Sequence, residues 1–213
     1  MGQAQMKLLL CSDLHDEEAA LESISKLSKL YDYTLVCGDI CSSNYFLQSA
    51  FENILNSYFI PGNSESKELN DILLESPQCL HGRQVEIKNG FNIVGFGYSS
   101  PTPYGTYGEL SEEEISSQLS KLKIDSKTIL MLHCPPFGYF DINKKGKNIG
   151  STSILSMIEQ RRPYLACFGH AHNRIGVGQL GETKLIKIPP ANEMSAVSLD
   201  INNDGFLAEF ISL

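Results

Sequence analysis

The chain has 213 residues, of which 42% are hydrophobic, and this size and composition predict one folded domain over residues 1–213. Its 17 Lys and Arg residues against 25 Asp and Glu residues give a formal net charge of −8, which argues against general binding of nucleic acid or anionic membranes because both need basic surface. The N-terminal apolar run "MKLLLCS" is far shorter than the ~20 residues of a membrane span, so we expect neither a span nor a secretory signal.

The first part of the chain alternates short apolar runs with stretches of helical spacing. The runs "KLLLCSD", "YTLVCGD" and "SYFIPGN" have the length and composition of strands that are buried on both faces. Each run precedes a predicted helix, and these helices cover residues 17–30, 45–55 and 67–74. Asp16 is the expected cap of the first helix. Repeated strand–helix units of this kind favour a parallel sheet.

The middle of the chain has a different pattern. "QVEIKNG" followed by "FNIVGFGY" predicts a β-hairpin, with Asn89 and Gly90 as the turn pair. A loop rich in Pro, Gly and Tyr follows, up to residue 110. Ser111 and Glu114 then have the spacing of a capping box, which predicts the start of a helix that ends near Leu122.

The last part of the chain is mostly strand. "TILMLHCPP" and "PYLACFGH" are predicted strands, with a helix over residues 151–160 between them. Four further strands are expected over residues 174–180, 183–189, 195–201 and 205–212, and "NNDG" at 202–205 has the composition of a hairpin turn. The whole pattern predicts an α/β protein with two sheets, the second of which ends in antiparallel strands.

Six cysteines are present and none forms a CxxC pair. Four of them lie in or beside the predicted strands, where a free thiol packs as a small apolar group. We therefore expect reduced cysteines, no cysteine zinc site and a cytoplasmic protein.

Polar side chains that can bind metal ions follow five of the predicted strands. Ligands bind at the carboxyl ends of strands in open α/β sheets, so these side chains are expected at one shared edge. The candidates are Asp13, His15, Asp39, Asn63, His133, His170 and His172. Taken singly, Asp39 could be a helix cap, Asn63 a turn residue and His133 a hydrogen-bonded core histidine.

The spacing and the chemistry of these residues indicate two metal ions. Residues two apart on an extended chain point the same way, so each of the pairs Asp13–His15 and His170–His172 could face one site. Glycines before the ligands allow the backbone to approach an ion closely. Imidazole, carboxylate and amide donors suit Mn²⁺, Fe, Zn²⁺, Co²⁺ or Ni²⁺. Seven ligands are more than one tetrahedral ion can bind, and they suit two ions ~3.5–4 Å apart.

The order "DLH … GD … GN … H … GHAH" resembles the calcineurin-like metallophosphoesterase superfamily, and the resemblance spans residues 13–172. The stretch "PTPYGTYGELSEEEI" is similar to small prokaryotic predicted phosphoesterases. The resemblance implies a four-layer α/β/β/α sandwich of two mixed sheets, with a dinuclear metal site at the carboxyl edge of the strands. By motif, the first ion would be held by Asp13, His15 and His172, the second by Asn63, His133 and His170, and Asp39 would bridge them.

The implied reaction is hydrolysis of a phosphodiester, or alternatively a phosphomonoester, by a metal-bridging hydroxide, with manganese as one candidate metal. Asp39, Asn63 and Ser64 are the candidate catalytic residues. Ser64 stands where many members have a histidine that protonates the leaving group, so we expect aryl diesters to react better than alkyl monoesters. Glu65, His81 or a metal-bound water are candidates to supply that proton, although His81 matches no ligand motif and could be purely structural.

Tyr98, Tyr104 and Arg174 are the candidate substrate contacts, with loop packing or a solvated surface as the alternative for each. The expected partner is a small phosphoester; nucleic acid and membrane are not expected, and a homo-oligomer is left open. Two other functions compete with the phosphoesterase. One is a non-catalytic protein-interaction scaffold on the same fold, which would have no need of an intact ligand set. The other is a nuclease, which the acidic balance disfavours.

Overall fold

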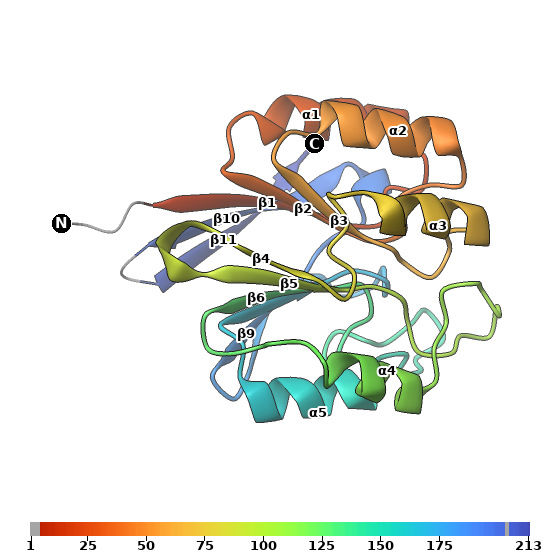
Figure 1. The fold of residues 1–213 in the computed structure, drawn as a ribbon, viewed down its shortest axis with the longest axis vertical. Coiled ribbons are helices and arrows are strands. Elements are labelled where there is room, and N and C mark those ends of the chain that lie inside the picture. Colours follow the sequence, from red (N-terminus) through yellow and green to blue (C-terminus); the bar gives the residue numbers. More distant parts are fainter. Residues whose placement is uncertain (1–4, 203–204) are drawn as a thin grey trace.

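Two β-sheets lie face to face, and helices cover their outer sides (Figure 1). The computed structural model describes residues 5–202 and 205–213. One sheet is covered by α1 (Glu18–Ser28), α2 (Asn44–Asn53) and α3 (Lys67–Glu75), and the other by α4 (Glu112–Leu119) and α5 (Thr152–Arg161). This arrangement is the predicted four-layer α/β/β/α sandwich.

The first sheet has the strand order β11-β10-β1-β2-β3. Its strands are β1 (Met6–Cys11), β2 (Tyr33–Cys37), β3 (Ser57–Ile60), β10 (Ser195–Asn202) and β11 (Gly205–Ser212). β1, β2 and β3 are parallel, as the repeated strand–helix units predict. β10 returns from the far end of the chain to pair antiparallel with β1, so this sheet also ends in antiparallel strands.

The second sheet has the strand order β4-β5-β6-β7-β9-β8. Its strands are β4 (Gln84–Glu86), β5 (Asn92–Phe96), β6 (Thr128–Leu132), β7 (Leu165–Phe168), β8 (Gly176–Leu180) and β9 (Thr183–Lys187). β5, β6, β7 and β9 run parallel, and an antiparallel strand closes each edge. Both sheets are therefore mixed.

Apolar side chains fill all three spaces between the four layers. In β1, Leu8 and Leu10 pack against the second sheet, whereas Leu9 and Cys11 pack under the helices of the first. Successive side chains of a strand point to opposite faces, so a strand with a core on each side must be apolar throughout. The continuous apolar runs of the sequence are explained by this double burial.

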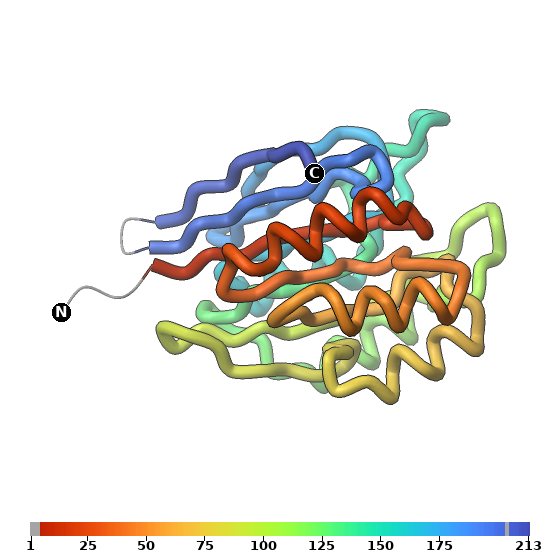
Figure 2. The backbone as a smooth tube through the Cα atoms, turned by 90° about the horizontal axis from the view of Figure 1, so that it is seen from above, coloured from red at the N-terminus to blue at the C-terminus, as the bar shows by residue number. Residues whose placement is uncertain are grey.

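The parallel strands of both sheets bring their carboxyl ends to one end of the molecule. The loops that follow these strands meet there, and the loop of residues 99–110 and the loop of residues 135–150 project from the same end (Figure 2). Every candidate metal ligand follows one of these strands in the sequence, so all of them lie at this end of the molecule.

Two predicted turns can be compared with the structure. Asn89 and Gly90 both have positive φ, 61° and 72°, and the N–H of Phe91 donates to the carbonyl of Lys88, which is the geometry of the predicted type I′ hairpin turn. The turn predicted at residues 202–205 includes Asn203 and Asp204, which lie outside the described residues.

The prediction that Asp16 caps α1 is wrong. The residue before α1 is Glu17, whose side chain makes no capping hydrogen bond. The Asp16 carboxylate instead accepts from the backbone N–H and the hydroxyl of Ser42, each at 2.7 Å. It therefore holds the loop after β2 against the loop after β1.

The predicted capping box of α4 is confirmed, since the Ser111 hydroxyl accepts from the Glu114 N–H and the Glu114 carboxylate accepts from the Ser111 N–H. We expect Ser111→Ala to lower the free energy of unfolding by about 1 kcal/mol, because an N–H at the helix start loses its acceptor. Ser116→Ala, at an exposed position inside the same helix, is the control and should leave stability unchanged or slightly raised. Urea unfolding of both variants measures the difference, and equal stabilities would contradict the prediction.

The six cysteines are all buried and free. Burial raises the pKa of the Cys11 and Cys134 thiols, the latter to about 11, so these side chains act as apolar packing groups. Among the described helices, we find none with the length and apolar character needed to cross a bilayer.

Candidate metal centre

The loops that follow β1 and β2 run side by side beyond the end of the sheet. The N–H of Asp13 donates to the carbonyl of Gly38 at 3.0 Å, and the N–H of His15 donates to the carbonyl of Asp39 at 3.1 Å. These hydrogen bonds fix the positions of the backbone atoms that carry the side chains. They place Asp13, His15 and Asp39 next to one another although His15 and Asp39 are 24 positions apart in the sequence.

The backbone at these ligands is not extended, so the predicted alternation of an extended chain is wrong. Asp13, His15, Asp39 and His170 have φ values of 56°, 47°, 51° and 69°. Such values lie in the left-handed region, which side chains other than glycine rarely occupy. Strain of this kind collects at functional sites, where surrounding contacts hold it in place. Tight turns, and not strand alternation, aim these side chains at the site.

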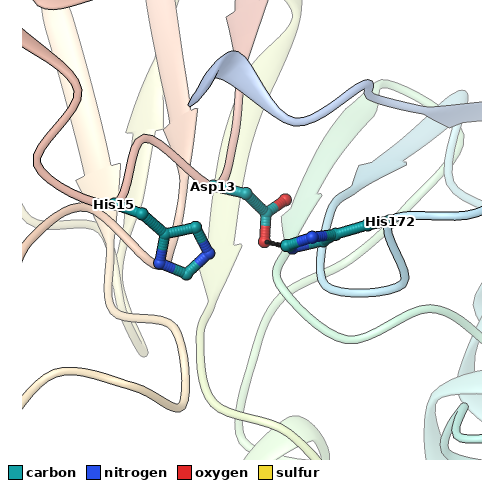
Figure 3. A group of neighbouring side chains, drawn as sticks. All are labelled: Asp13, His15 and His172. Carbon is teal, nitrogen blue, oxygen red and sulfur yellow. Dashed lines mark hydrogen bonds and ion pairs between the residues drawn. The ribbon is translucent and has the colours of Figure 1, made fainter. Parts of the chain in front are cut away.

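The first group of potential ligands consists of Asp13, His15 and His172, each of which offers an atom within 4.8 Å of the others. Figure 3 shows the side chains of these residues converging from the loop after β1 and the loop after β7. His172 Nε2 lies 3.2 Å from Asp13 Oδ1, and the His15 and His172 rings are 5.5 Å apart. The backbone N–H of His170 also donates to the Asp13 carboxylate, at 3.2 Å from Oδ2.

The second group consists of Asp39, His133 and His170, which also offer atoms within 4.8 Å of one another. His133 is fully buried, and its Nδ1 lies 2.8 Å from the carbonyl of Cys37. A carbonyl only accepts, so Nδ1 carries a proton, and Nε2 is the ring nitrogen that faces the site. Asn63 Oδ1 lies 3.1 Å from this Nε2.

Asp39 faces both groups. Its Oδ2 lies 3.8 Å from His15 Nε2, and its Oδ1 lies 3.5 Å from His133 Nε2. A carboxylate in this position can contact two ions at once. Asp39 therefore lies between the two groups.

The donor set fits divalent cations. Nε2 of His170 is buried and has no hydrogen-bond partner among the described residues. Burial, and next the charge of His133, lower the pKa of His170 to about 3, so its ring is neutral and Nε2 can present a lone pair to a cation. A buried polar atom without a partner is costly, and a metal ion would satisfy it.

The charges of the first group are also suited to a cation. Burial by itself raises the pKa of Asp13, but the hydrogen bond from His172 and the positive charges of His133 and Lys187 hold the pKa well below its usual range. The hydrogen bond to Asp13 in turn raises the pKa of His172. Asp13 is consequently an ionised carboxylate that is buried at the site.

Comparison with known proteins agrees with this geometry. The family model described as calcineurin-like phosphoesterase matches residues 6–174, which include all seven candidate ligands. The chain belongs to the calcineurin-like phosphoesterase family. The activity shared at this level is metal-dependent hydrolysis of phosphoric esters, and the two groups of ligands provide a dinuclear site for divalent ions.

Three similar proteins illustrate the range of the match. The uncharacterized protein MJ1162 of Methanocaldococcus jannaschii is 29% identical over 197 residues, which cover 87% of this chain and 88% of that protein. The crystal structure of TT1561 of Thermus thermophilus shares the fold with a TM-score of 0.72 and 16% identity, covering 97% of this chain and 99% of that one. A structure described as a novel archaeal phosphodiesterase has a TM-score of 0.53 and 14% identity, covering 98% and 100%.

Glycines of the family motifs are required by the packing of the ligands. Gly38 has a φ of 85°, which other residues rarely adopt, and a methyl group on it would overlap the ring of His133. Gly62 has an ordinary backbone, but a methyl group there would overlap both Oδ1 and the backbone nitrogen of Asp39. The side chains of the centre can approach one another only because these positions lack a Cβ.

Ser64 and Glu65, which follow Asn63, both hold other parts of the site. The Ser64 hydroxyl donates to Asp39 Oδ1 at 2.8 Å, and its backbone N–H donates to the same atom at 3.0 Å. Glu65 is fully buried and accepts from the backbone N–H groups of Ile40 and Gly62. Burial, and next the charge of Asp39, raise the pKa of Glu65 to about 7. With both oxygens engaged away from solvent, Glu65 braces the loops and is poorly placed to protonate a substrate.

The side chains considered for substrate contact and proton transfer lie in different surroundings. Tyr104 is 82% exposed at the tip of the loop of residues 99–110, and Arg174 is exposed two residues after His172. Tyr98 is half-buried with its ring 4.6 Å from that of His81. His81 Nδ1 accepts from the N–H of Gly97, and burial lowers the pKa of His81 to about 4, which favours its structural role over proton donation.

Three residues near the centre were not found from the sequence. Thr106 accepts a hydrogen bond from the Asn63 side chain at 2.8 Å and donates to Glu109 at 2.6 Å. Lys187 is fully buried at the end of β9, where burial lowers its pKa to about 8 and its Nζ donates to the carbonyl of Ile188. A lysine in the apolar run "KLIKIPP" was the only signal for Lys187, and no motif marked the other two.

Proposed function

We propose that this protein is a phosphodiesterase with two divalent metal ions. Asp13, His15 and His172 hold one ion in this proposal. Asn63, His133 and His170 hold the other, and Asp39 bridges the two. The observation that supports it best is the position of Asp39, whose two oxygens face the two groups of imidazoles at 3.8 and 3.5 Å.

The residues of the chain prepare the site for an anionic substrate. When bound, two divalent ions would supply positive charge near the phosphoryl oxygens and would lower the pKa of an attacking water. The N–H and hydroxyl of Ser64 and the N–H of Asn63 orient the Asp39 carboxylate through hydrogen bonds to Oδ1. The exposed Tyr104 and Arg174 and the half-buried Tyr98 are the proposed substrate contacts.

Two features support a diester with a good leaving group as the substrate. Ser64 occupies the place of the proton-donating histidine, and its hydroxyl is engaged with Asp39. Without a general acid, a leaving group must depart with little help, which favours aryl over alkyl esters. The likeness in fold to the archaeal phosphodiesterase is consistent with this choice.

Ser64→His is expected to raise kcat/KM for alkyl esters, at most by the ~10²–10⁴-fold that general acid catalysis supplies, and to change aryl esters much less. A series of esters with different leaving-group pKa values measures the effect as a shallower dependence of rate on that pKa. Ser64→Ala is the control, because it removes the hydrogen bond to Asp39 without adding an imidazole. Equal wild-type rates on aryl diesters and alkyl monoesters would reject the idea.

The proposal also covers the identity of the metal ions, the class of substrate and the cellular compartment. The ions are Mn²⁺, Fe, Zn²⁺, Co²⁺ or Ni²⁺, because nitrogen and oxygen donors suit these metals, and Mn²⁺ is the first to test. The proposed substrate is a small phosphoester rather than nucleic acid, given the net charge of −8. We place the protein in the cytoplasm as a single domain, with free buried cysteines in support of a reducing compartment.

The deciding experiment combines metal analysis with a phosphoester panel. The purified protein is stripped with a chelator, reloaded with Mn²⁺, Ni²⁺ or Zn²⁺, and assayed on aryl diesters, cyclic nucleotides, monoesters and single-stranded DNA. We expect two bound ions and hydrolysis of small diesters. Absence of both metal uptake and hydrolysis would favour the scaffold, and cleavage confined to DNA would favour the nuclease.

A further inference from the structure

A chain of three hydrogen-bonded side chains links the candidate ligand Asn63 to the loop of residues 99–110. Asn63 Nδ2 donates to Thr106 Oγ1 at 2.8 Å, and Thr106 Oγ1 donates to Glu109 Oε1 at 2.6 Å. The backbone N–H of Thr106 donates to the same Glu109 oxygen at 2.8 Å. Asn63 is buried, whereas Thr106 and Glu109 are partly buried between it and the surface.

The direction of these hydrogen bonds is determined by Glu109, the last of the three residues. An ionised carboxylate can only accept, and hydrogen bonds from Thr102 and Thr106 hold the pKa of Glu109 at about 2 although partial burial opposes this. The single proton of the Thr106 hydroxyl therefore goes to Glu109. Its oxygen is left as an acceptor, so the side chain of Asn63 must present its NH₂ group to Thr106.

This direction decides which atom of Asn63 faces the metal centre. The two ends of an amide differ little in shape, and a half-turn of the side chain would exchange them. Only the oxygen can bind a cation, because the amide nitrogen has no available lone pair. With NH₂ held by Thr106, Oδ1 points to the site, 3.1 Å from His133 Nε2.

We propose that Thr106 is a positioning residue for the second metal ion: its hydroxyl, oriented by Glu109, holds the Asn63 amide with its oxygen toward the ion. The inference rests on the proposed dinuclear centre. It assigns a role to the Tyr-rich loop that is independent of substrate contact.

The backbone supports the same contact. The N–H of Gly108 donates to the carbonyl of Asn63 at 3.1 Å, and the N–H of Ser99 donates to the carbonyl of Gly108 at 2.9 Å. The loop is thus attached to the Asn63 backbone two residues after Thr106, and Ser99 at its start is joined to the same residue, Gly108. This attachment keeps the Thr106 hydroxyl within reach of the Asn63 amide.

The chain offers a matched set of variants for a test. Thr106→Val removes the hydroxyl and keeps the shape, whereas Thr106→Ser keeps the hydroxyl. Thr102→Val removes the other hydroxyl that donates to Glu109, also at 2.6 Å, but this residue makes its contacts within the loop and to Glu109 rather than to Asn63. Comparing the two valine variants separates loss of the Asn63 contact from general loosening of the loop.

Metal binding is measured by calorimetric titration of stripped protein with Mn²⁺, by the spin–spin signature of paired Mn²⁺ in electron paramagnetic resonance, and by thermal unfolding. We expect Thr106→Val to bind one ion normally and the second about 10–100-fold more weakly, the usual cost of losing a partner of a metal ligand. Thr106→Ser and Thr102→Val should bind both ions as the wild type does. Activity of Thr106→Val should return when Mn²⁺ is raised, which a substrate-binding role would not predict.

Three outcomes would overturn the inference, and they are distinguishable. If Thr106→Val binds both ions as tightly as the wild type, the positioning role is wrong while the dinuclear centre stands. If the wild-type protein itself binds no second ion, the proposed centre falls and the role of Thr106 falls with it. Equal weakening in the two valine variants would assign the effect to the loop and also reject a specific role for Thr106.

Discussion

Asp39→Asn is expected to lower kcat/KM for a phosphodiester by about 10²–10³-fold, the scale of losing a group that organises transition-state charge. The carboxylate faces both groups of imidazoles, and its Oδ1 also accepts from Asn63 and Ser64. An amide of the same size presents one oxygen and one NH₂ group, so it cannot contact two cations. We expect the variant to fold, to bind one ion and to lose the paired-ion signature.

Asp16→Asn is the matched control for this substitution. Asp16 also lies in the loop after β1 and has a left-handed backbone, but its carboxylate accepts from Ser42 rather than facing the imidazoles. The control should keep both ions and wild-type kcat/KM, with some loss of thermal stability. Metal content by elemental analysis and steady-state kinetics decide the matter. An Asp39→Asn protein with two ions and wild-type activity would refute the bridging role.

Gly62→Ala is expected to lower the free energy of unfolding by ~1–3 kcal/mol or more and to abolish binding of at least one ion. The added methyl group would overlap Oδ1 and the backbone nitrogen of Asp39. Backbone atoms cannot move aside as a flexible side chain can, so the loop after β2 must shift. That shift carries the bridging carboxylate away from His133.

Gly82→Ala separates the steric effect from a general cost of replacing glycine. Gly82 has a φ of 68° and no atom within 4 Å of an added methyl group, so its variant should lose ~1–2 kcal/mol from backbone strain alone. It should bind both ions normally. Chemical denaturation and calorimetric metal titration of the two variants test the difference. Normal metal binding by Gly62→Ala would show that the loop tolerates the methyl group and that the close approach is not required.

Much of the architecture follows from local sequence patterns. The strands β1, β2 and β3 are visible as continuous apolar runs because they are buried on both faces, and the helices after them are visible because their apolar residues recur with the period of a helix. The Asn89-Gly90 turn and the Ser111 capping box depend on interactions within four residues. Polar residues at the strand ends predicted one edge for the site, and the structure places those seven side chains together there. Their assignment to individual ions stays a prediction.

Other features depend on contacts between distant segments, which no short pattern encodes. β10 pairs with β1 across almost the whole chain, and the left-handed turns at Asp13 and His170 form only because neighbouring loops hold them. The direction of Asp39 toward both groups and the chain from Asn63 through Thr106 to Glu109 arise in the same way. The sequence by itself determined which residue types reach the edge of the sheets, because strand burial and motif order are local properties. Only the tertiary structure decided how those side chains are aimed, because aim depends on hydrogen bonds and steric limits between loops that are far apart in the chain.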